Sequence, residues 1–144
     1  GSGGSQRHPH SQIIGLDTYD YKDNIDRENF LGPIVHEDQD CYATVSDYPI
    51  SGMGEMNVTL KKDASPEKFA DTIQTLARYV LNDFPLPCTS YNIFFYHFKH
   101  IRAKIFPRYT ASPLYMGYHI THVMDHESQK RMLEKLHTGT YFGE

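Results

Sequence analysis

The sequence predicts an α+β fold, with an antiparallel β-sheet flanked by one long and one short helix. Three observations lead to this prediction. Residues 66–83 place apolar side chains at helical spacing, the segments on either side are rich in β-branched and aromatic residues, and a short amphipathic stretch lies near the C-terminus. Strands that come before and after a long helix, rather than alternating with helices, are typical of α+β proteins. A chain of 144 residues is expected to form a single domain, 1–144.

The first elements are expected to be strands and one short helical segment. An isoleucine pair supplies the apolar content of a strand over residues 11–16, and the charged residues 20–29 predict a helical turn or short helix. In residues 33–45, two apolar patches flank a polar stretch, which predicts a hairpin. Residues 56–60 alternate between apolar and polar side chains, so they predict a half-buried strand.

The clearest element is a helix from Pro66 to about Asp83. Ser65 is a suitable N-cap, proline fits the first helical position, and Glu67 favours the positive start of the helix. Prolines at positions 85 and 87 end the helix. The apolar residues at helical spacing form one face that is expected to pack on the sheet, namely Phe69, Ile73, Leu76, Ala77, Val80 and Leu81.

The C-terminal third is expected to complete the sheet. Residues 91–98 (YNIFFYHF) are aromatic and predict a central strand, with Phe94-Phe95-Tyr96 in the sheet core rather than as a platform for stacking bases. Residues 101–109 predict a second strand, and residues 114–123 a third. A short amphipathic helix is expected over residues 127–136.

Composition excludes several functional classes. The net charge of −4 gives no broad cationic surface, which argues against a nucleic-acid partner but leaves room for a local basic site for one phosphorylated ligand. Two cysteines are too few for a disulfide framework, so a cytoplasmic location is expected. The sequence contains no apolar run of a membrane span and no signal-peptide core, so no membrane partner is expected.

The segment His8-Pro9-His10-Ser11-Gln12 carries the strongest chemical signal. In an extended chain, His8, His10 and Gln12 project from the same face. A neutral imidazole can attack a phosphorus atom and form a covalent phosphoryl- or nucleotidyl-histidine. The amide of Gln12 can donate a hydrogen bond to the charge that builds on a phosphoryl oxygen. The alternative is a tail with adventitious metal affinity, although the isoleucine pair that follows favours an ordered strand.

This motif resembles the His-Pro-His-x-Gln signature of galactose-1-phosphate uridylyltransferases, a family of the histidine-triad-like superfamily. The similarity continues in order along the chain and covers the C-terminal portion of that family, which implies a histidine-triad-like fold. Further segments that are similar to the family are Asp26-Arg27-Glu28, Cys41 to Val45, Tyr48-Pro49, the Pro66 helix, Tyr91 to His97, Ile105-Phe106-Pro107 and Met116-Gly117-Tyr118.

The resemblance implies roles for the first twelve residues. His10 is the nucleophile that becomes nucleotidylated, and Gln12 binds the transferred phosphoryl group. Residues 1–7 correspond to a small-residue loop in which Gly4 and Ser5 bind phosphate through backbone N–H groups and a hydroxyl. For Gly1-Ser2 the alternative is the remnant of a tag, whereas Gly3 to Ser5 are expected to belong to the native loop.

The resemblance also bears on metal binding, because some members carry zinc. His8 matches a structural zinc ligand whose partners lie upstream in the family, so no cofactor is expected unless an upstream segment supplies ligands. In a second family metal site, Glu28 and His97 match two ligands, whereas Arg102 and Lys104 replace the other two. Cationic side chains cannot act as ligands, so we expect this metal site to be lost. Arg102 is then expected either to pair with Glu28 or to lie on an exposed basic strand.

Other clusters give weaker indications of a functional site. His119, His122 and His126 can be read as a metal cluster, but a surface or partly buried role is the stronger interpretation. One local basic group consists of Lys99, Arg102, Lys104 and Arg108. These side chains are expected to be solvated unless some of them bind the phosphates of a ligand. In the hexose-binding stretch, the family's Lys-Phe pair and Glu are replaced by Pro113-Leu114 and His119, which argues against galactose as the sugar.

The resemblance therefore implies a nucleotidyltransferase that moves a nucleoside monophosphate between a nucleotide sugar and a sugar phosphate. One alternative is a nucleotide hydrolase or phosphorylase of the histidine-triad kind. Another is a non-catalytic fragment, or a half-domain for interaction or dimerisation, of a longer protein. The expected partners are a nucleotide or nucleotide-sugar substrate and a second copy of the chain, because the family assembles its sites between subunits.

Overall fold

The computed structural model describes residues 10–11, 13, 17–18, 20–108 and 124–142 and confirms the α+β class. Two short 3-10 helices come first and are followed by five strands, with one long helix after the third strand and one shorter helix at the end. In chain order the elements are η1 (Tyr21–Asp23), η2 (Arg27–Phe30), β1 (Ile34–Glu37), β2 (Cys41–Val45), β3 (Met56–Leu60), α1 (Pro66–Asn82), β4 (Tyr91–His97), β5 (Ile101–Pro107) and α3 (His126–Thr138).

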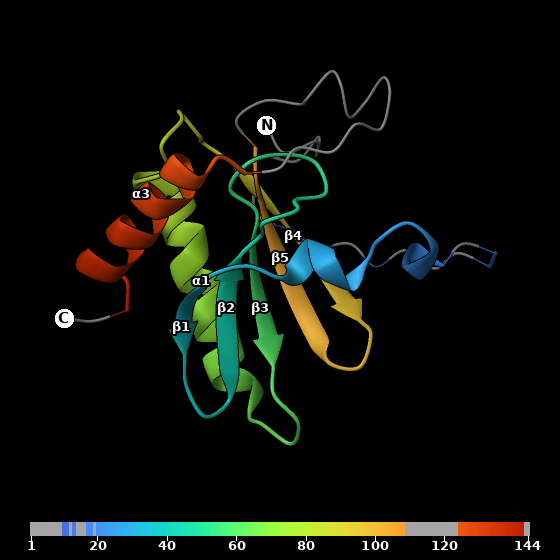
Figure 1. Ribbon diagram of the computed structural model, residues 1–144. Coiled ribbons are helices and arrows are strands. Elements are labelled where there is room, and N and C mark those ends of the chain that lie inside the picture. Colours follow the sequence, from blue (N-terminus) through green and yellow to red (C-terminus); the bar gives the residue numbers. More distant parts are fainter. Residues whose placement is uncertain (1–9, 12, 14–16, 19, 109–123, 143–144) are drawn as a thin grey trace.

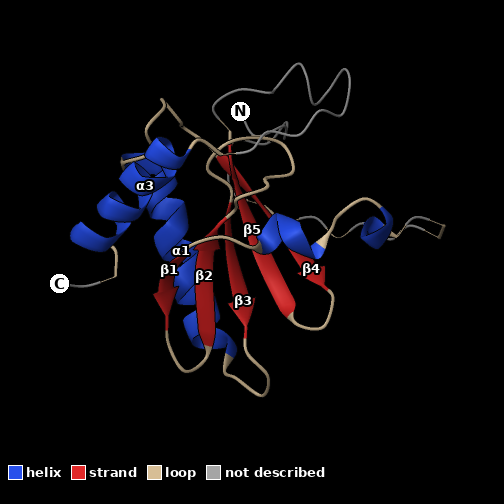
Figure 2. Ribbon diagram, viewed as in Figure 1, coloured by secondary structure: helices blue, strands red, loops and turns tan. Residues whose placement is uncertain are grey.

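The five strands form one antiparallel sheet in the order β1-β2-β3-β5-β4 (Figure 2). The hairpin predicted over residues 33–45 is confirmed as β1 and β2. The prediction that residues 91–98 form a central strand is wrong, because β4 is the last strand of the described sheet and β5 lies inside it. Phe94 and Phe95 are accordingly 51% and 63% exposed, while Tyr96 is buried. Apolar residues on both faces of a segment indicate a preference for β-structure, but they do not indicate where that strand lies in the sheet.

Helix α1 covers one face of the sheet (Figure 1). The Oγ atom of Ser65 accepts a hydrogen bond from the backbone N–H of Glu67 at 3.4 Å, as expected for an N-cap. The buried side of the helix consists of Phe69, Thr72, Ile73, Leu76, Ala77, Tyr79 and Val80. Leu81, which was expected on this side, is 46% exposed, because the buried side turns toward Thr72 and Tyr79 instead.

The face of the sheet under α1 is apolar. Cross-strand neighbours on this face include Ala43, Val58 and Ala103, which are fully buried in a row across β2, β3 and β5. The next row contains Met56 and Ile105, which are also fully buried. Since alternate side chains in a strand point to opposite faces, the residues between these core positions must face away from α1.

Helix α3 lies beside α1 and next to β1 (Figure 1). Asp125 caps it by accepting hydrogen bonds from the backbone N–H and the hydroxyl of Ser128, both at 2.9 Å. Met132 and Leu136 bury its apolar side, and Phe142 stacks on the His36 ring at a centroid distance of 4.5 Å. No helix in the described part of the chain is long and apolar enough to cross a membrane.

Two predicted strands cannot be compared with the structure. Most of the strand expected at 11–16 and all of that expected at 114–123 lie outside the described residues. The expected helical segment at 20–29 is present as η1 and η2, and η2 passes in front of β5 on the face opposite α1 (Figure 1).

Candidate functional site

The face of the sheet opposite α1 is polar, yet it is buried. Its side chains form two rows across the strands, as the registers of β2, β3, β5 and β4 require. The first row is Tyr42, Thr59, Arg102 and Tyr96, and the second row is Thr44, Asn57, Lys104 and Phe94. Within these rows, Thr44, Asn57, Thr59, Arg102 and Lys104 are all at most 5% exposed. This concentration of buried polar groups is the candidate functional site.

The second row is organised around an ion pair between Lys104 and Glu55. Lys104 Nζ lies 3.0 Å from Glu55 Oε2, and the two side chains are 0% and 1% exposed. Lys104 Nζ also donates hydrogen bonds to the backbone carbonyl of Asn29 at 2.6 Å and to Ser46 Oγ at 2.8 Å. Burial lowers the pKa of Lys104, and the carboxylate of Glu55 opposes that effect. The three acceptors around Nζ satisfy the three donors of an ammonium group.

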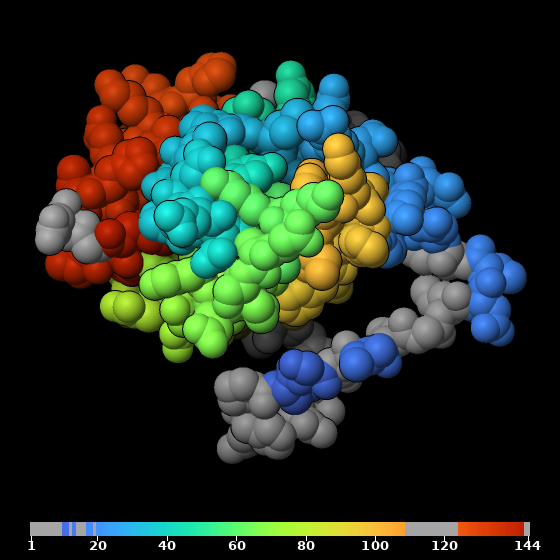
Figure 3. Space-filling view, turned by 90° about the horizontal axis from the view of Figure 1, so that it is seen from below, coloured from blue at the N-terminus to red at the C-terminus, as the bar shows by residue number. Residues whose placement is uncertain are grey.

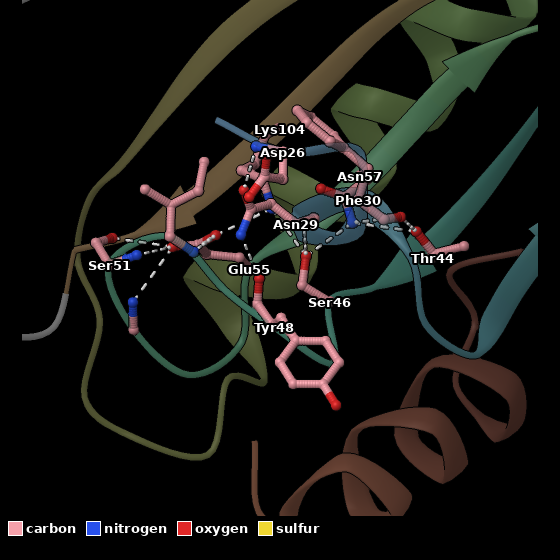
Figure 4. Close-up of polar contacts among 12 residues, drawn as sticks. Asp26, Asn29, Phe30, Thr44, Ser46, Tyr48, Ser51, Glu55, Asn57 and Lys104 are labelled. Atoms are coloured by element: carbon pink, nitrogen blue, oxygen red, sulfur yellow. Dashed lines mark hydrogen bonds and ion pairs between the residues drawn. The ribbon is translucent and has the colours of Figure 1, made fainter. Parts of the chain in front are cut away.

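Glu55 also holds the loop between β2 and β3 in place. Its carboxylate accepts hydrogen bonds from the backbone N–H groups of Ile50 at 2.8 Å, Ser51 at 2.6 Å and Gly52 at 3.2 Å. The hydroxyl of Ser51 donates a fourth hydrogen bond at 2.9 Å (Figure 4). Three consecutive N–H groups converging on one carboxylate fix the loop backbone, so the ion pair connects this loop to the centre of the sheet.

Side chains of neighbouring strands complete a polar network around the ion pair (Figure 4). Asn57 Nδ2 donates to Ser46 Oγ at 2.9 Å and to Thr44 Oγ1 at 3.1 Å. The hydroxyls of Thr44 and Ser46 donate in turn to the backbone carbonyls of Phe30 and Asn29, at 2.9 Å and 2.6 Å. These bonds fasten η2 onto the sheet. We use the name polar network for Asn29, Thr44, Ser46, Glu55, Asn57 and Lys104.

Aromatic rings close the other side of this face. Tyr21, Phe30, Tyr96 and Phe98 pack edge to face, with ring centroids 5.2–5.7 Å apart; we call them the aromatic cluster. The hydroxyl of Tyr21 donates to the carbonyl of His97 at 2.9 Å and accepts from its N–H at 2.7 Å. The segment around η1 therefore attaches to the end of β4, and Figure 3 shows this segment in blue next to the β4–β5 hairpin.

Arg102 differs from Lys104 in its surroundings. Its side chain is buried, and its guanidinium carbon lies 5.6 Å from the Phe30 ring centroid and 5.8 Å from the Phe98 ring centroid. Within the described residues no carboxylate, carbonyl or hydroxyl forms a hydrogen bond or ion pair with it. The expected Arg102–Glu28 ion pair is therefore wrong for the described residues, and Glu28 is exposed on η2.

The expectation of an exposed basic strand is also wrong for the two residues that belong to β5. Arg102 and Lys104 are buried, whereas Lys99 and Arg108, beyond the ends of the strand, are exposed. His97, expected near Glu28 as a former metal position, has an exposed side chain. The strand places Arg102 and Lys104 together on one face, as their spacing requires, but η2 and the aromatic cluster bury them.

The residues predicted to carry the chemistry lie at the N-terminus. His10 is described and its side chain is exposed. Gly4, Ser5, His8 and Gln12 lie outside the described residues, as do His119 and His122. His126 is exposed at the first position of α3. Across residues 20–108 and 124–142, and the few described before them, no group of three or more His, Cys, Asp or Glu side chains could hold a metal ion.

Sequence reasoning did not identify Glu55, Asn57 or Ser46. The signal for Asn57 was present, because the alternation in residues 56–60 places it on the face opposite the apolar core. That pattern predicted a solvated face, whereas η2 covers it and makes the polar side chains bond to one another. Ser46 and Glu55 flank the loop between β2 and β3, and no pattern in the sequence predicts a role for them.

Comparison with known proteins gives two similarities. Residues 22–142 match the family described as "Domain of unknown function (DUF4931) C-terminal domain". The crystal structure of a DUF4931 family protein from Bacillus cereus ATCC 10987 is similar to this chain, with a TM-score of 0.76 and 40% sequence identity. That similarity covers 95% of this chain and 64% of the other, so this chain spans less than two thirds of its relative. No curated protein matches the chain.

Proposed function

We propose, from the premise that this chain belongs to the DUF4931 C-terminal domain family, that it takes part in nucleotidyl transfer through His10. A nucleoside monophosphate would move from a nucleotide sugar, or another nucleoside polyphosphate, to a phosphate-bearing acceptor. The resemblance of His8-Pro9-His10-Ser11-Gln12 to the uridylyltransferase signature motivates this proposal.

The observation that carries the proposal is the exposure of His10 within this motif. A nucleophile must be reached by the phosphorus atom that it attacks, and the imidazole of His10 is exposed. The other exposed histidines of the described chain, such as His97 and His126, have no companion histidine two residues away. His10 is therefore the histidine for which both sequence context and accessibility favour covalent chemistry.

The chemistry proceeds in two displacements. A neutral imidazole nitrogen of His10 attacks the α-phosphorus, an N–P bond forms, and the bond from that phosphorus to the leaving phosphate oxygen breaks. The leaving group departs with the electron pair of that bond. An oxygen of the acceptor phosphate then attacks the same phosphorus, the N–P bond breaks, and His10 is regenerated. Gln12 is proposed to donate a hydrogen bond to a non-bridging oxygen.

The acceptor decides the reaction class. A sugar phosphate as acceptor makes the protein a transferase, inorganic phosphate makes it a phosphorylase, and water makes it a hydrolase. The same histidine adduct occurs in all three reactions. Intact mass spectrometry therefore tests the adduct first, and analysis of the products then shows which acceptor is used.

The test is intact mass spectrometry after incubation with a UDP-hexose or a dinucleoside polyphosphate. We expect a stoichiometric, acid-labile adduct of one nucleoside monophosphate. His10→Ala should abolish the adduct, because the attacking nitrogen is gone. His126→Ala is the matched control, because His126 is exposed on a helix and lacks the motif. Absence of an adduct from a folded sample, with every nucleotide offered, would overturn the proposal and favour a non-catalytic role.

The remaining expectations stay proposals as well. A second copy of the chain is proposed as a partner, and light scattering of the purified protein would show a mass of twice 16.6 kDa. A cytoplasmic location is proposed from the cysteine content.

A further inference from the structure

Arg102 and Thr59 are two buried donors that face each other across β5 and β3. They are direct partners in the antiparallel register, so their side chains leave the sheet side by side on the face opposite α1. Arg102 is 5% exposed and Thr59 is 2% exposed. Within the described part of the chain, no acceptor forms a hydrogen bond with either side chain.

The charge of this face is unbalanced at Arg102. Lys104, two residues along the same strand, is neutralised by Glu55 at 3.0 Å, and its three donors have acceptors. Glu55 is itself occupied by Lys104 and by the loop N–H groups. Among the described residues, the buried charges of this face are therefore the cations of Arg102 and Lys104 and the single anion of Glu55. Arginine stays protonated in proteins, so the excess positive charge belongs to Arg102.

The rings beside Arg102 compensate for this charge only in part. Phe30 and Phe98 lie within cation–π distance, and such contacts stabilise a cation electrostatically through the faces of the rings. The rings accept no hydrogen bonds from the five N–H groups, which lie at the edge of the planar guanidinium. Among the described residues, the fully buried side-chain polar atoms that lack a partner are Asn57 Oδ1 and Tyr79 Oη, so the N–H groups of Arg102 keep some contact with solvent and can reach a ligand. The low exposure of the Arg102 side chain strengthens the attraction between its guanidinium and an anion.

We propose that Arg102 and Thr59 form a binding site for a phosphate group. The planar fork of a guanidinium binds two oxygens of an oxyanion at once. The hydroxyl of Thr59, on the neighbouring strand, donates to a third oxygen. A phosphate group offers three or more oxygens and fits this set of donors, whereas a carboxylate uses both of its oxygens on the fork. This inference does not rest on the chemistry proposed for His10.

The test is titration calorimetry of the folded protein with inorganic phosphate, with uridine monophosphate, and with uridine as the phosphate-free compound. We expect the wild type to bind one or both phosphate compounds and not uridine. Arg102→Gln should weaken this binding at least about tenfold, because the hydrogen bonds to the charged group are lost. Arg102→Lys should weaken it less, since it keeps the charge but loses the fork. Lys99→Gln, which removes an exposed cation near the same hairpin, should bind like the wild type.

Thr59→Val provides a second route if Arg102→Gln does not fold. This substitution keeps the shape of the side chain and removes the hydroxyl, so we expect weaker phosphate binding in a folded protein. Binding of inorganic phosphate would show a site for the free ion, whereas binding of the nucleotide alone would show a site for a phosphate group on a larger ligand. Equal phosphate affinity in wild type, Arg102→Lys and Thr59→Val would overturn the proposal, as would the absence of phosphate binding to the wild type. Weaker phosphate binding in Arg102→Gln is measured separately from the His10 adduct, so this inference and the nucleotidyl-transfer proposal can fail separately.

Discussion

Lys104 is a residue whose environment in the structure differs from the one that the sequence predicts. In the sequence it is a basic residue on a strand, where a solvated side chain is the ordinary expectation. In the structure it is fully buried, and it binds Glu55, Ser46 and the carbonyl of Asn29. A buried ion pair does not by itself add much stability, but removing one partner leaves the other charge buried and unpaired.

Lys104→Met is therefore expected to destabilise the protein by about 3 to 5 kcal/mol. The measurement is the free energy of unfolding from urea denaturation. Lys99→Met, at an exposed position, serves as the control and should change the free energy by less than about 0.5 kcal/mol. The double variant Lys104→Met, Glu55→Gln should recover part of the loss, because no charge is then left buried. Equal stability of Lys104→Met and Lys99→Met would contradict the assignment.

Asp38, in the turn between β1 and β2, makes stability depend on pH. Burial alone would raise its pKa, but the backbone N–H groups of Cys41 and Asp40 and the ring of His36 lower the pKa to about 2. Because the folded pKa lies below the ordinary value of 3.8, the stabilisation is fully present above that value and is lost as the pH falls toward 2. The predicted loss is about 2 kcal/mol.

Acid unfolding of Asp38→Asn checks this prediction. The variant should be less stable than the wild type at neutral pH, and its stability should change less between pH 4 and pH 2 because the titrating group is gone. Asp71→Asn, at an exposed position of α1, should keep the slope of the wild type. An unchanged slope in Asp38→Asn would show that other carboxylates cause the acid unfolding.

At the scale of the element, α1 was predicted almost residue for residue. Its N-cap, its first-turn proline and its periodic apolar residues are local signals, and the structure places the helix at Pro66–Asn82. The prediction is wrong for one leucine, Leu81. The periodicity placed Leu76 and Leu81 on one face, whereas the structure buries the first completely and leaves the second 46% exposed.

This difference gives a matched pair of substitutions. Leu76→Ala should lower the free energy of unfolding by about 2 to 5 kcal/mol, because it leaves a cavity between α1 and the sheet. Leu81→Ala removes the same atoms from the same helix with the same propensity change, but from a half-exposed position, and should cost much less. Chemical denaturation of both variants measures the difference. Similar losses would mean that the helix is rotated relative to its position here.

The strands show the limit of element-scale prediction. The segments of β4 and β5 were both predicted as strands, and both are strands. Their predicted order in the sheet is wrong, because the aromatic content of residues 91–98 predicts a central strand and the structure has β4 at the end of the described sheet. In the structure the centre belongs to β5, whose cations are hidden by η2 and the aromatic cluster, while β4 ends the described sheet.

At the scale of the whole molecule, the sheet separates two kinds of interior. One face packs on α1 and is apolar, so it supplies the hydrophobic stabilisation of the fold. The other face is covered by the N-terminal segment that carries η1 and η2, and it holds the polar network together with Arg102 and Thr59. Substitutions in the first interior should act on stability, whereas substitutions at Arg102 and Thr59 should act on ligand binding.

The sequence alone predicts the α+β class, the long helix, the hairpin and the segments that become β3, β4 and β5. These features depend on residues near one another in the chain, through caps, prolines and periodicity. It also identified His10 as the candidate nucleophile, through a short motif whose proposed role stands open to test. Local patterns carry this information because they reflect the preferences of the backbone itself.

The burial of the polar face of the sheet depends on contacts between segments that are far apart in the chain. Glu55 and Lys104 are 49 residues apart and Asn29 and Lys104 are 75 apart, so no local pattern links them. Alternation in a strand tells which side chains share a face, but it does not tell whether solvent or another segment covers that face. Because η2 covers β5, the basic residues that were expected on a surface are buried. Lys104 is paired with Glu55, whereas Arg102 has no acceptor among the described residues.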